Sequence, residues 1–91
     1  MYLKFYTKNF QKSLKKILTG GKINREEVED VIDFLASGQK LHPIYQDHPL
    51  RGEFEGCREC HIRGDILLIY RTEEQKLVLV LIDIGSHSEL F

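Results

Sequence analysis

The sequence lacks an apolar run long enough to cross a membrane, since its longest run, residues 77–82, has the length of a β-strand. Its N-terminus also lacks the long apolar region and small-residue cleavage site of a secretory signal. We therefore expect a cytoplasmic protein with no membrane partner and with reduced thiols. The 91 residues suffice for one small hydrophobic core, which predicts a single domain over residues 1–91.

Cysteine and methionine are scarce, and this bears on one motif. Residues 57–61 match the C-x-x-C-H pattern of covalent haem attachment. That attachment requires export, and the only methionine is Met1, so the usual distal haem ligand is missing. Zinc is not expected either, because residues three apart on a strand point to opposite faces and one ion does not easily take both Cys57 and Cys60. Despite the pattern that they form with His61, we predict no haem, zinc or other cofactor.

Net charge is also small, −1 at pH 7, but the charges are unevenly distributed along the chain. Every charged residue before Glu26 is a Lys or Arg, whereas every charged residue in 26–33 is acidic. This asymmetry indicates opposed solvated faces or, alternatively, a basic surface that approaches RNA phosphates.

Apolar residues recur at helical spacing in two N-terminal segments, after a weakly alternating strand candidate at residues 1–6. The first segment follows the N-cap candidate Thr7, and its stripe consists of Phe10, Leu14, Ile17 and Leu18. The second follows Asn24 and stops near Gly38, with a stripe of Val28, Val31, Ile32 and Leu35. The short connection predicts an antiparallel helix pair.

The C-terminal half reads as a loop followed by a small sheet. Residues 41–56 have no clear period and predict an ordered loop. Strands are predicted at 57–62, 65–71 and 76–84, and their short turns indicate an antiparallel meander. The fold class is therefore α+β, with the helix pair on one face of the sheet and the chemistry on the open face.

Histidines from separate segments are the candidate chemical groups, because histidine exchanges protons near neutral pH. His61 ends the first predicted strand and Asp65 begins the next, so a two-residue turn holds them close. His87 follows the third strand and approaches both, because that strand runs antiparallel to the second. With His48 from the preceding loop, this set is suited to general acid–base chemistry.

Cleavage of RNA through its own 2′-hydroxyl needs only such groups. A base removes the 2′-hydroxyl proton, a cation stabilises the phosphorane, and an acid protonates the leaving 5′-oxygen. Two histidines, a carboxylate and an arginine supply these functions without a metal ion. The pattern therefore indicates a small, metal-independent nuclease.

Nearly the whole chain resembles the YafQ-type toxins of the RelE/ParE superfamily, the toxin halves of bacterial toxin–antitoxin pairs. The resemblance is most specific in three blocks: residues 45–52 (YQDHPLRG), residues 58–61 (RECH) with Asp65 and 68–70 (LIY), and residues 85–91 (GSHSELF). It implies a RelE-like fold and cleavage of messenger RNA in the ribosomal A site, leaving a 2′,3′-cyclic phosphate. It also implies a cognate antitoxin that wraps the toxin and occludes the site.

The resemblance also implies roles for the four catalytic candidates. It makes His87 the general acid at the 5′-oxygen. His48 or His61 acts as base or positions the 2′-hydroxyl, and Asp65 orients a histidine.

Substrate contacts follow from the same resemblance. Phe91 is expected to stack on a base, and Arg51 and Arg58 to face phosphate. Glu59 completes the predicted substrate contacts. Two positions depart from the family pattern: the family more often has Asp at position 59, and it often has an aromatic residue at position 66. These departures bear on substrate grip and codon preference.

Two other functions fit the same fold. One is a toxin or binding module without ribonuclease activity, such as a gyrase poison, but mere binding does not require three histidines around one carboxylate. The other is a ribosome-independent ribonuclease, which the near-neutral charge disfavours because unaided RNA binding depends on positive charge.

Overall fold

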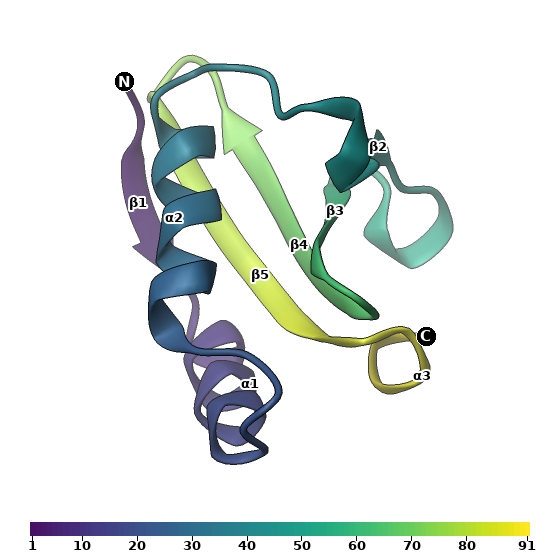
Figure 1. Ribbon diagram of the computed structural model, residues 1–91. Coiled ribbons are helices and arrows are strands. Elements are labelled where there is room, and N and C mark those ends of the chain that lie inside the picture. The colour runs from purple at the N-terminus through teal and green to yellow at the C-terminus, as the bar shows by residue number, and fades with distance from the viewer.

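The structure, a computed structural model, describes residues 1–91 and contains one five-stranded sheet with helices packed against it (Figure 1). The strand order is β1-β5-β4-β3-β2, with β1 parallel to β5 and all other neighbours antiparallel. The strands are β1 (Leu3–Tyr6), β2 (His48–Pro49), β3 (Arg58–Arg63), β4 (Ile66–Glu73) and β5 (Val78–Ser86).

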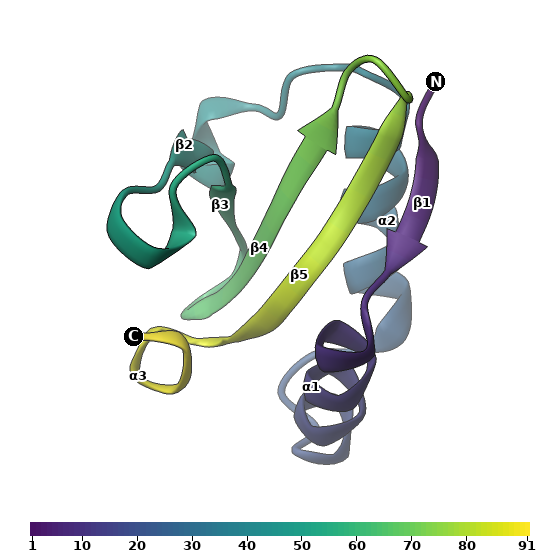
Figure 2. The ribbon, with the colours of Figure 1, turned by 180° about the vertical axis from the view of Figure 1, so that it is seen from behind.

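Three α-helices and two 3₁₀ turns complete the chain. The helices are α1 (Lys8–Thr19), α2 (Arg25–Ala36) and α3 (His87–Leu90), and the turns are η1 (Pro43–Tyr45) and η2 (Gly52–Phe54). Figure 2 shows the opposite face of β4 and β5, which no helix covers. The predicted α+β class, with an open sheet face, is confirmed.

The predicted helix starts are confirmed by their capping contacts. The Thr7 hydroxyl accepts a hydrogen bond from the Phe10 backbone N–H at 3.0 Å. Asn24 and Glu27 form a reciprocal capping box, in which each side chain accepts from the other's backbone N–H, at 2.8 and 3.2 Å. These signals are local in sequence, so they specify α1 and α2 without tertiary information.

Other features differ from the sequence prediction. The parallel partner of β1 is β5, and β2 lies within the segment predicted as a loop. The four-residue α3 was not predicted. The contacts of α1 are chiefly with β5 and those of α2 with β3, so side-by-side packing of the two helices stays a prediction.

The hydrophobic core lies between the helices and one face of the sheet. Cys60, Leu68 and Ile84 form a row across β3, β4 and β5 and pack in this core with Phe10 of α1 and α2 side chains. Because successive strand residues point to opposite faces, their neighbours in sequence project to the open face.

The two free thiols differ in burial, and this predicts different reactivity. Cys60 is fully buried whereas Cys57 is half-buried. Burial, with the nearby Asp47 and Glu59 carboxylates, raises the pKa of the Cys60 thiol to about 12. We expect iodoacetamide to alkylate Cys57 in the native protein and Cys60 only after unfolding, because the thiolate is the reactive form. Mass spectrometry of the labelled peptides measures this, and equal native labelling would contradict it.

The same shift has a consequence for stability. The pKa of Cys60 is higher in the folded protein than its ordinary value of 9.0, so the folded state holds the thiol proton more tightly. Stability from this group is therefore complete below pH 9.0 and falls as the pH rises toward 12.

Candidate active site

Strand register brings two candidate residues from different segments side by side. His48 of β2 pairs with Glu59 of β3, and Glu59 pairs with Ile69 of β4. Cross-strand partners project from the same face of a sheet, so His48 and Glu59 share the open face. His61 joins them because it is two residues after Glu59 on the same strand.

Glu59 lies between the two imidazoles. Its Oε1 is 3.7 Å from Nε2 of His48 and 4.0 Å from Nε2 of His61. The Glu59 side chain is only 7% exposed, whereas the His48 and His61 side chains are 49% and 29% exposed. A buried carboxylate at these distances stabilises a positive charge on whichever imidazole takes up a proton.

The hydrogen bonding of His48 sets its neutral tautomer. Its Nδ1 lies 2.8 Å from the backbone carbonyl oxygen of Gln46. A carbonyl oxygen only accepts, so Nδ1 carries the hydrogen and donates it. The lone pair of the neutral ring is therefore on Nε2, the atom that faces Glu59, which suits His48 to accept a proton there.

The third histidine stands on α3, directly after β5. Ser86 caps this helix: its backbone N–H and its hydroxyl donate to Glu89 Oε1 at 2.9 and 3.0 Å. These hydrogen bonds from Ser86 lower the pKa of Glu89. On this helix the ring centroids of His87 and Phe91 are 5.1 Å apart, and Phe91 meets Phe54 of η2 edge-on at 5.7 Å.

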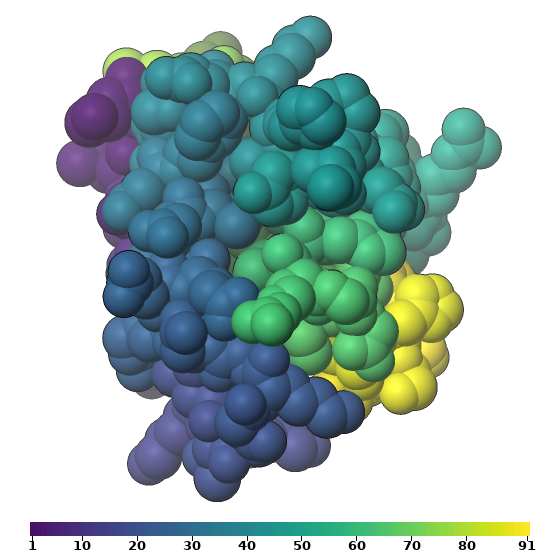
Figure 3. Space-filling view, in the orientation of Figure 1, coloured from purple at the N-terminus to yellow at the C-terminus, as the bar shows by residue number.

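The ends of the two long strands bring α3 to the β3–β4 turn, as the sequence predicted. Ile66 at the start of β4 pairs with Ser86 at the end of β5. Asp65, just before β4, and His87, just after β5, therefore lie at the same end of this strand pair. Figure 3 shows the yellow C-terminal segment beside the green segment that contains this turn. Asp65 is exposed, and no hydrogen bond or ion pair of the structure joins it to a histidine. Its orienting role stays a prediction, and Glu59 is the carboxylate beside the imidazoles.

The structure does not bring Arg58 to the histidines. Arg58 precedes Glu59 and points to the other face of β3, where its Nε donates to Asp47 Oδ1 at 2.6 Å. This placement does not support the phosphate contact predicted for Arg58. Arg51 is exposed in the connection after β2 and remains a phosphate-contact candidate. Ile66 packs in the helix-side core, so it belongs to the fold rather than to the histidine face.

Sequence reasoning assigned no role to Asp47, which the structure shows to be half-buried and bonded to Arg58 and Tyr70. These partners are 11 and 23 residues further along the chain. An acid in a proline-containing loop gives no local signal of such contacts, because they depend on how the loop docks on the sheet.

Two further properties concern metals and membranes. No group of three or more His, Cys, Asp and Glu side chains is arranged to hold a metal ion. None of the helices combines the length and apolar character needed to span a bilayer.

Comparisons with known proteins identify relatives over the whole chain. Residues 2–91 match the family described as bacterial toxin of type II toxin–antitoxin system, YafQ. The mRNA interferase toxin YafQ of Escherichia coli K12 is 37% identical over 51 residues, which span 56% of this chain and 53% of the relative. The chain thus aligns with about half the length of that curated relative.

Solved structures match over nearly their full length. A metal-bound toxin from Helicobacter pylori is 42% identical, with 100% of both chains covered and a TM-score of 0.88. A chain of the E. coli DinJ–YafQ complex is 25% identical, with 100% of this chain and 99% of that chain covered and a TM-score of 0.85. From the family match and the shared fold, the chain belongs to the YafQ toxin family of bacterial type II toxin–antitoxin systems.

Proposed function

We propose that the protein is a ribosome-dependent endoribonuclease that cleaves messenger RNA in the A site. The observation that carries this proposal is the buried Glu59 carboxylate between His48 and His61, on the sheet face that no helix covers. Membership of a toxin family that includes mRNA interferases supports the substrate class.

His48 is the proposed general base. Its Nε2 lone pair takes the proton of the 2′-hydroxyl, and the 2′-oxygen then attacks the adjacent phosphorus. Glu59 stabilises the imidazolium that forms, because it lies 3.7 Å from the protonated nitrogen. His61, beside the same carboxylate, donates to a phosphate oxygen as negative charge develops there.

His87 is the proposed general acid. The bond from phosphorus to the 5′-oxygen breaks as the 2′-oxygen bond forms, and His87 gives its proton to the leaving 5′-oxygen. The products are a 2′,3′-cyclic phosphate and a 5′-hydroxyl. His48 holds the proton that it took and His87 lacks one, so proton exchange with water restores both histidines.

Phe91 is the proposed base-stacking residue, and its truncation tests this role. Its ring is 53% exposed at the chain end, beside His87. We expect Phe91→Ala to weaken substrate positioning by about 1–3 kcal/mol, a typical value for base–aromatic stacking. The rate of cleavage and the melting temperature are measured for the wild type and for Phe91→Ala. Phe34→Ala is the control, because Phe34 is also an exposed phenylalanine, on α2. A large loss of thermal stability in Phe91→Ala would count against a stacking role.

A cognate antitoxin is the proposed protein partner, as in the DinJ–YafQ complex of the E. coli relative. The open sheet face and α3 carry all three histidines of the site, so an antitoxin segment that covers them blocks the RNA. We further propose that cleavage requires no metal ion, because histidine side chains supply both proton transfers.

Primer extension on a defined messenger RNA tests the function directly. Purified protein, either untreated or treated with EDTA and then dialysed to remove the chelator, is incubated with the RNA alone and with programmed ribosomes. We expect cuts only with ribosomes, at A-site register, and to the same extent with both protein preparations. Cuts without ribosomes would show a free ribonuclease, and absence of cuts in every sample would favour a toxin or binding module without ribonuclease activity. The chelator is removed before the assay because ribosomes themselves require Mg²⁺.

A further inference from the structure

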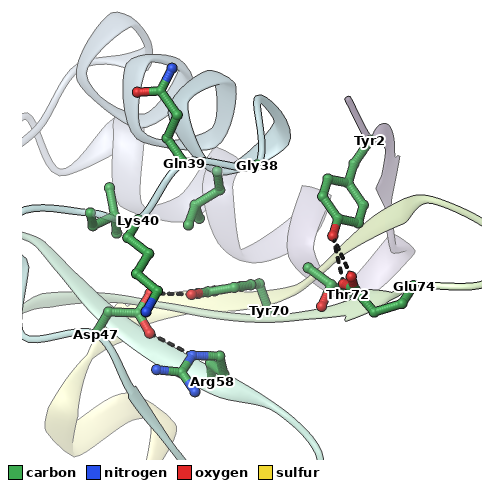
Figure 4. Close-up of a pocket in the computed structure, with 11 residues that line it drawn as sticks. Tyr2, Gly38, Gln39, Lys40, Asp47, Arg58, Tyr70, Thr72 and Glu74 are labelled. Atoms are coloured by element: carbon green, nitrogen blue, oxygen red, sulfur yellow. Dashed lines mark hydrogen bonds and ion pairs between the residues drawn. The ribbon is translucent and has the colours of Figure 1, made fainter.

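A pocket of about 490 Å³ lies on the helix side of the sheet, on the opposite face from Glu59 and His61 of β3 (Figure 4). At one end, Asp47 contacts Arg58 and Tyr70; at the other, the Tyr2 hydroxyl bonds to Glu74. The mechanism above uses none of these residues. Asp47 is nevertheless linked to the candidate site, because the next residue in the sequence is His48.

We propose that Asp47 is a positioning residue that fixes His48 by tying the loop before it to β3 and β4. This inference rests on the proposed function, because it assigns His48 to the reaction. In this proposal the position of the His48 imidazole depends on the contacts of Asp47 with Arg58 and Tyr70, on the opposite face of the sheet.

Both carboxylate oxygens of Asp47 are engaged. Oδ1 accepts from Arg58 Nε at 2.6 Å, and Oδ2 accepts from the Tyr70 hydroxyl. Tyr70 is 3% exposed, and its burial together with the Asp47 carboxylate raises the pKa of the phenol. The phenol therefore stays protonated at neutral pH and continues to donate. A half-buried carboxylate with two donors on two strands is a rigid attachment point.

The segment around Asp47 needs such an attachment. β2 has only two residues, so strand pairing alone holds His48 weakly. Gln46 has φ of 52°, a left-handed conformation that is unfavourable for a residue with a side chain. Such a conformation persists where the surrounding contacts enforce it. Next to Gln46, Asp47 contacts Arg58 and Tyr70, and His48 Nδ1 donates to the Gln46 carbonyl oxygen.

The same attachment maintains the tautomer of His48. The Gln46 carbonyl that accepts from Nδ1 of His48 lies one residue before Asp47. If the loop moved, this hydrogen bond would be lost and the proton could occupy either ring nitrogen. Anchoring at Asp47 therefore keeps the lone pair on Nε2, where the reaction needs it.

Asp47 acts without touching the RNA. Its carboxylate faces the helix side with Arg58 and Tyr70, whereas His48 and Glu59 are on the open face. Its effect must pass through the loop backbone, which predicts a change in kcat rather than in KM. A misplacement of about 1 Å transmitted in this way costs about 100-fold in rate.

Three variants separate positioning from general stability. Asp47→Ala removes the attachment. Asp47→Asn retains an oxygen that accepts from Arg58 and an amide that donates to the Tyr70 oxygen. Glu74→Ala is the matched control, because it removes a carboxylate–tyrosine contact from the other end of the same pocket.

The measurements are kcat and KM in the ribosome assay, thermal unfolding, and the ¹⁵N chemical shifts of the His48 ring, which report its tautomer. We expect Asp47→Ala to lower kcat about 100-fold at nearly constant KM, with mixed His48 tautomers. Asp47→Asn should recover most of kcat, and Glu74→Ala should keep wild-type kcat and a single tautomer.

Two results would overturn the proposal: wild-type kcat in Asp47→Ala, or an unchanged His48 tautomer in that variant when it is folded. Absence of RNA cleavage by the wild-type protein would instead refute the proposed function. The tautomer measurement tests the attachment in either case, so the two failures are distinguishable.

Discussion

Replacing His87 by alanine is expected to abolish detectable cleavage of messenger RNA while leaving the fold and antitoxin binding intact. Loss of a general acid typically costs about 10²–10⁴ in rate. His87 is exposed on the four-residue α3, and its removal leaves the Ser86–Glu89 cap in place. Primer extension, thermal unfolding and antitoxin titration measure the three properties separately.

A modified substrate makes this test specific to proton donation. An RNA with sulfur in place of the leaving 5′-oxygen releases a thiolate, which leaves readily without a proton. We expect this substrate to restore cleavage by His87→Ala but to change the wild-type rate little. Ser88→Ala, the next residue on α3, is the control and should behave as wild type. Full activity of His87→Ala on ordinary RNA would refute the proposed acid.

Replacing Glu59 by glutamine is expected to reduce cleavage about tenfold to 100-fold without lowering thermal stability. The variant keeps the shape of the side chain but removes the charge that stabilises an imidazolium at His48 or His61. Glu59 is the one charged side chain in the buried set, and its partners are two part-exposed imidazoles rather than close hydrogen-bond donors. A buried carboxylate placed in this way disfavours folding, so its neutralisation should leave the melting temperature equal or higher.

Asp65→Asn in parallel decides which carboxylate orients the histidines. Asp65 is exposed at the turn before β4, so we expect a smaller loss of activity than in Glu59→Gln. A larger loss in Asp65→Asn would return the orienting role to Asp65, as the family resemblance implies. A fall in melting temperature of Glu59→Gln with activity retained would show that Glu59 only supports the fold.

Local signals explain which parts of the fold were predictable. Thr7 and the Asn24–Glu27 pair cap helices within three residues, so their effect is visible in sequence order. Ser86 and Glu89 have the same spacing, so the start of α3 has an equally local signal in the sequence. The pairing of β1 with β5 was not predictable in this way, because it joins Leu3 to Val78 across the whole chain.

In the candidate site, too, some features follow from local signals and others depend on pairing between distant segments. His61, Asp65 and His87 lie at the same end of β3, β4 and β5, and this placement follows from hairpin turns whose antiparallel direction is set by short connections. The position of Glu59 between His48 and His61 requires the exact register of β2 on β3, including which face each side chain takes. A shift of one residue would exchange the faces, and no local feature of residues 45–52 sets that register.

By itself, the amino-acid sequence determined the helices, the meander, the histidine set and the family resemblance, because each depends on residue type and short-range spacing. Only the tertiary structure decided that Glu59 is the carboxylate beside the imidazoles and that Arg58 turns away to hold Asp47. The positions of the Glu59 and Arg58 side chains depend on burial and on pairing between distant segments. Such interactions exist only once the sheet is assembled, which is why residue order alone did not reveal them.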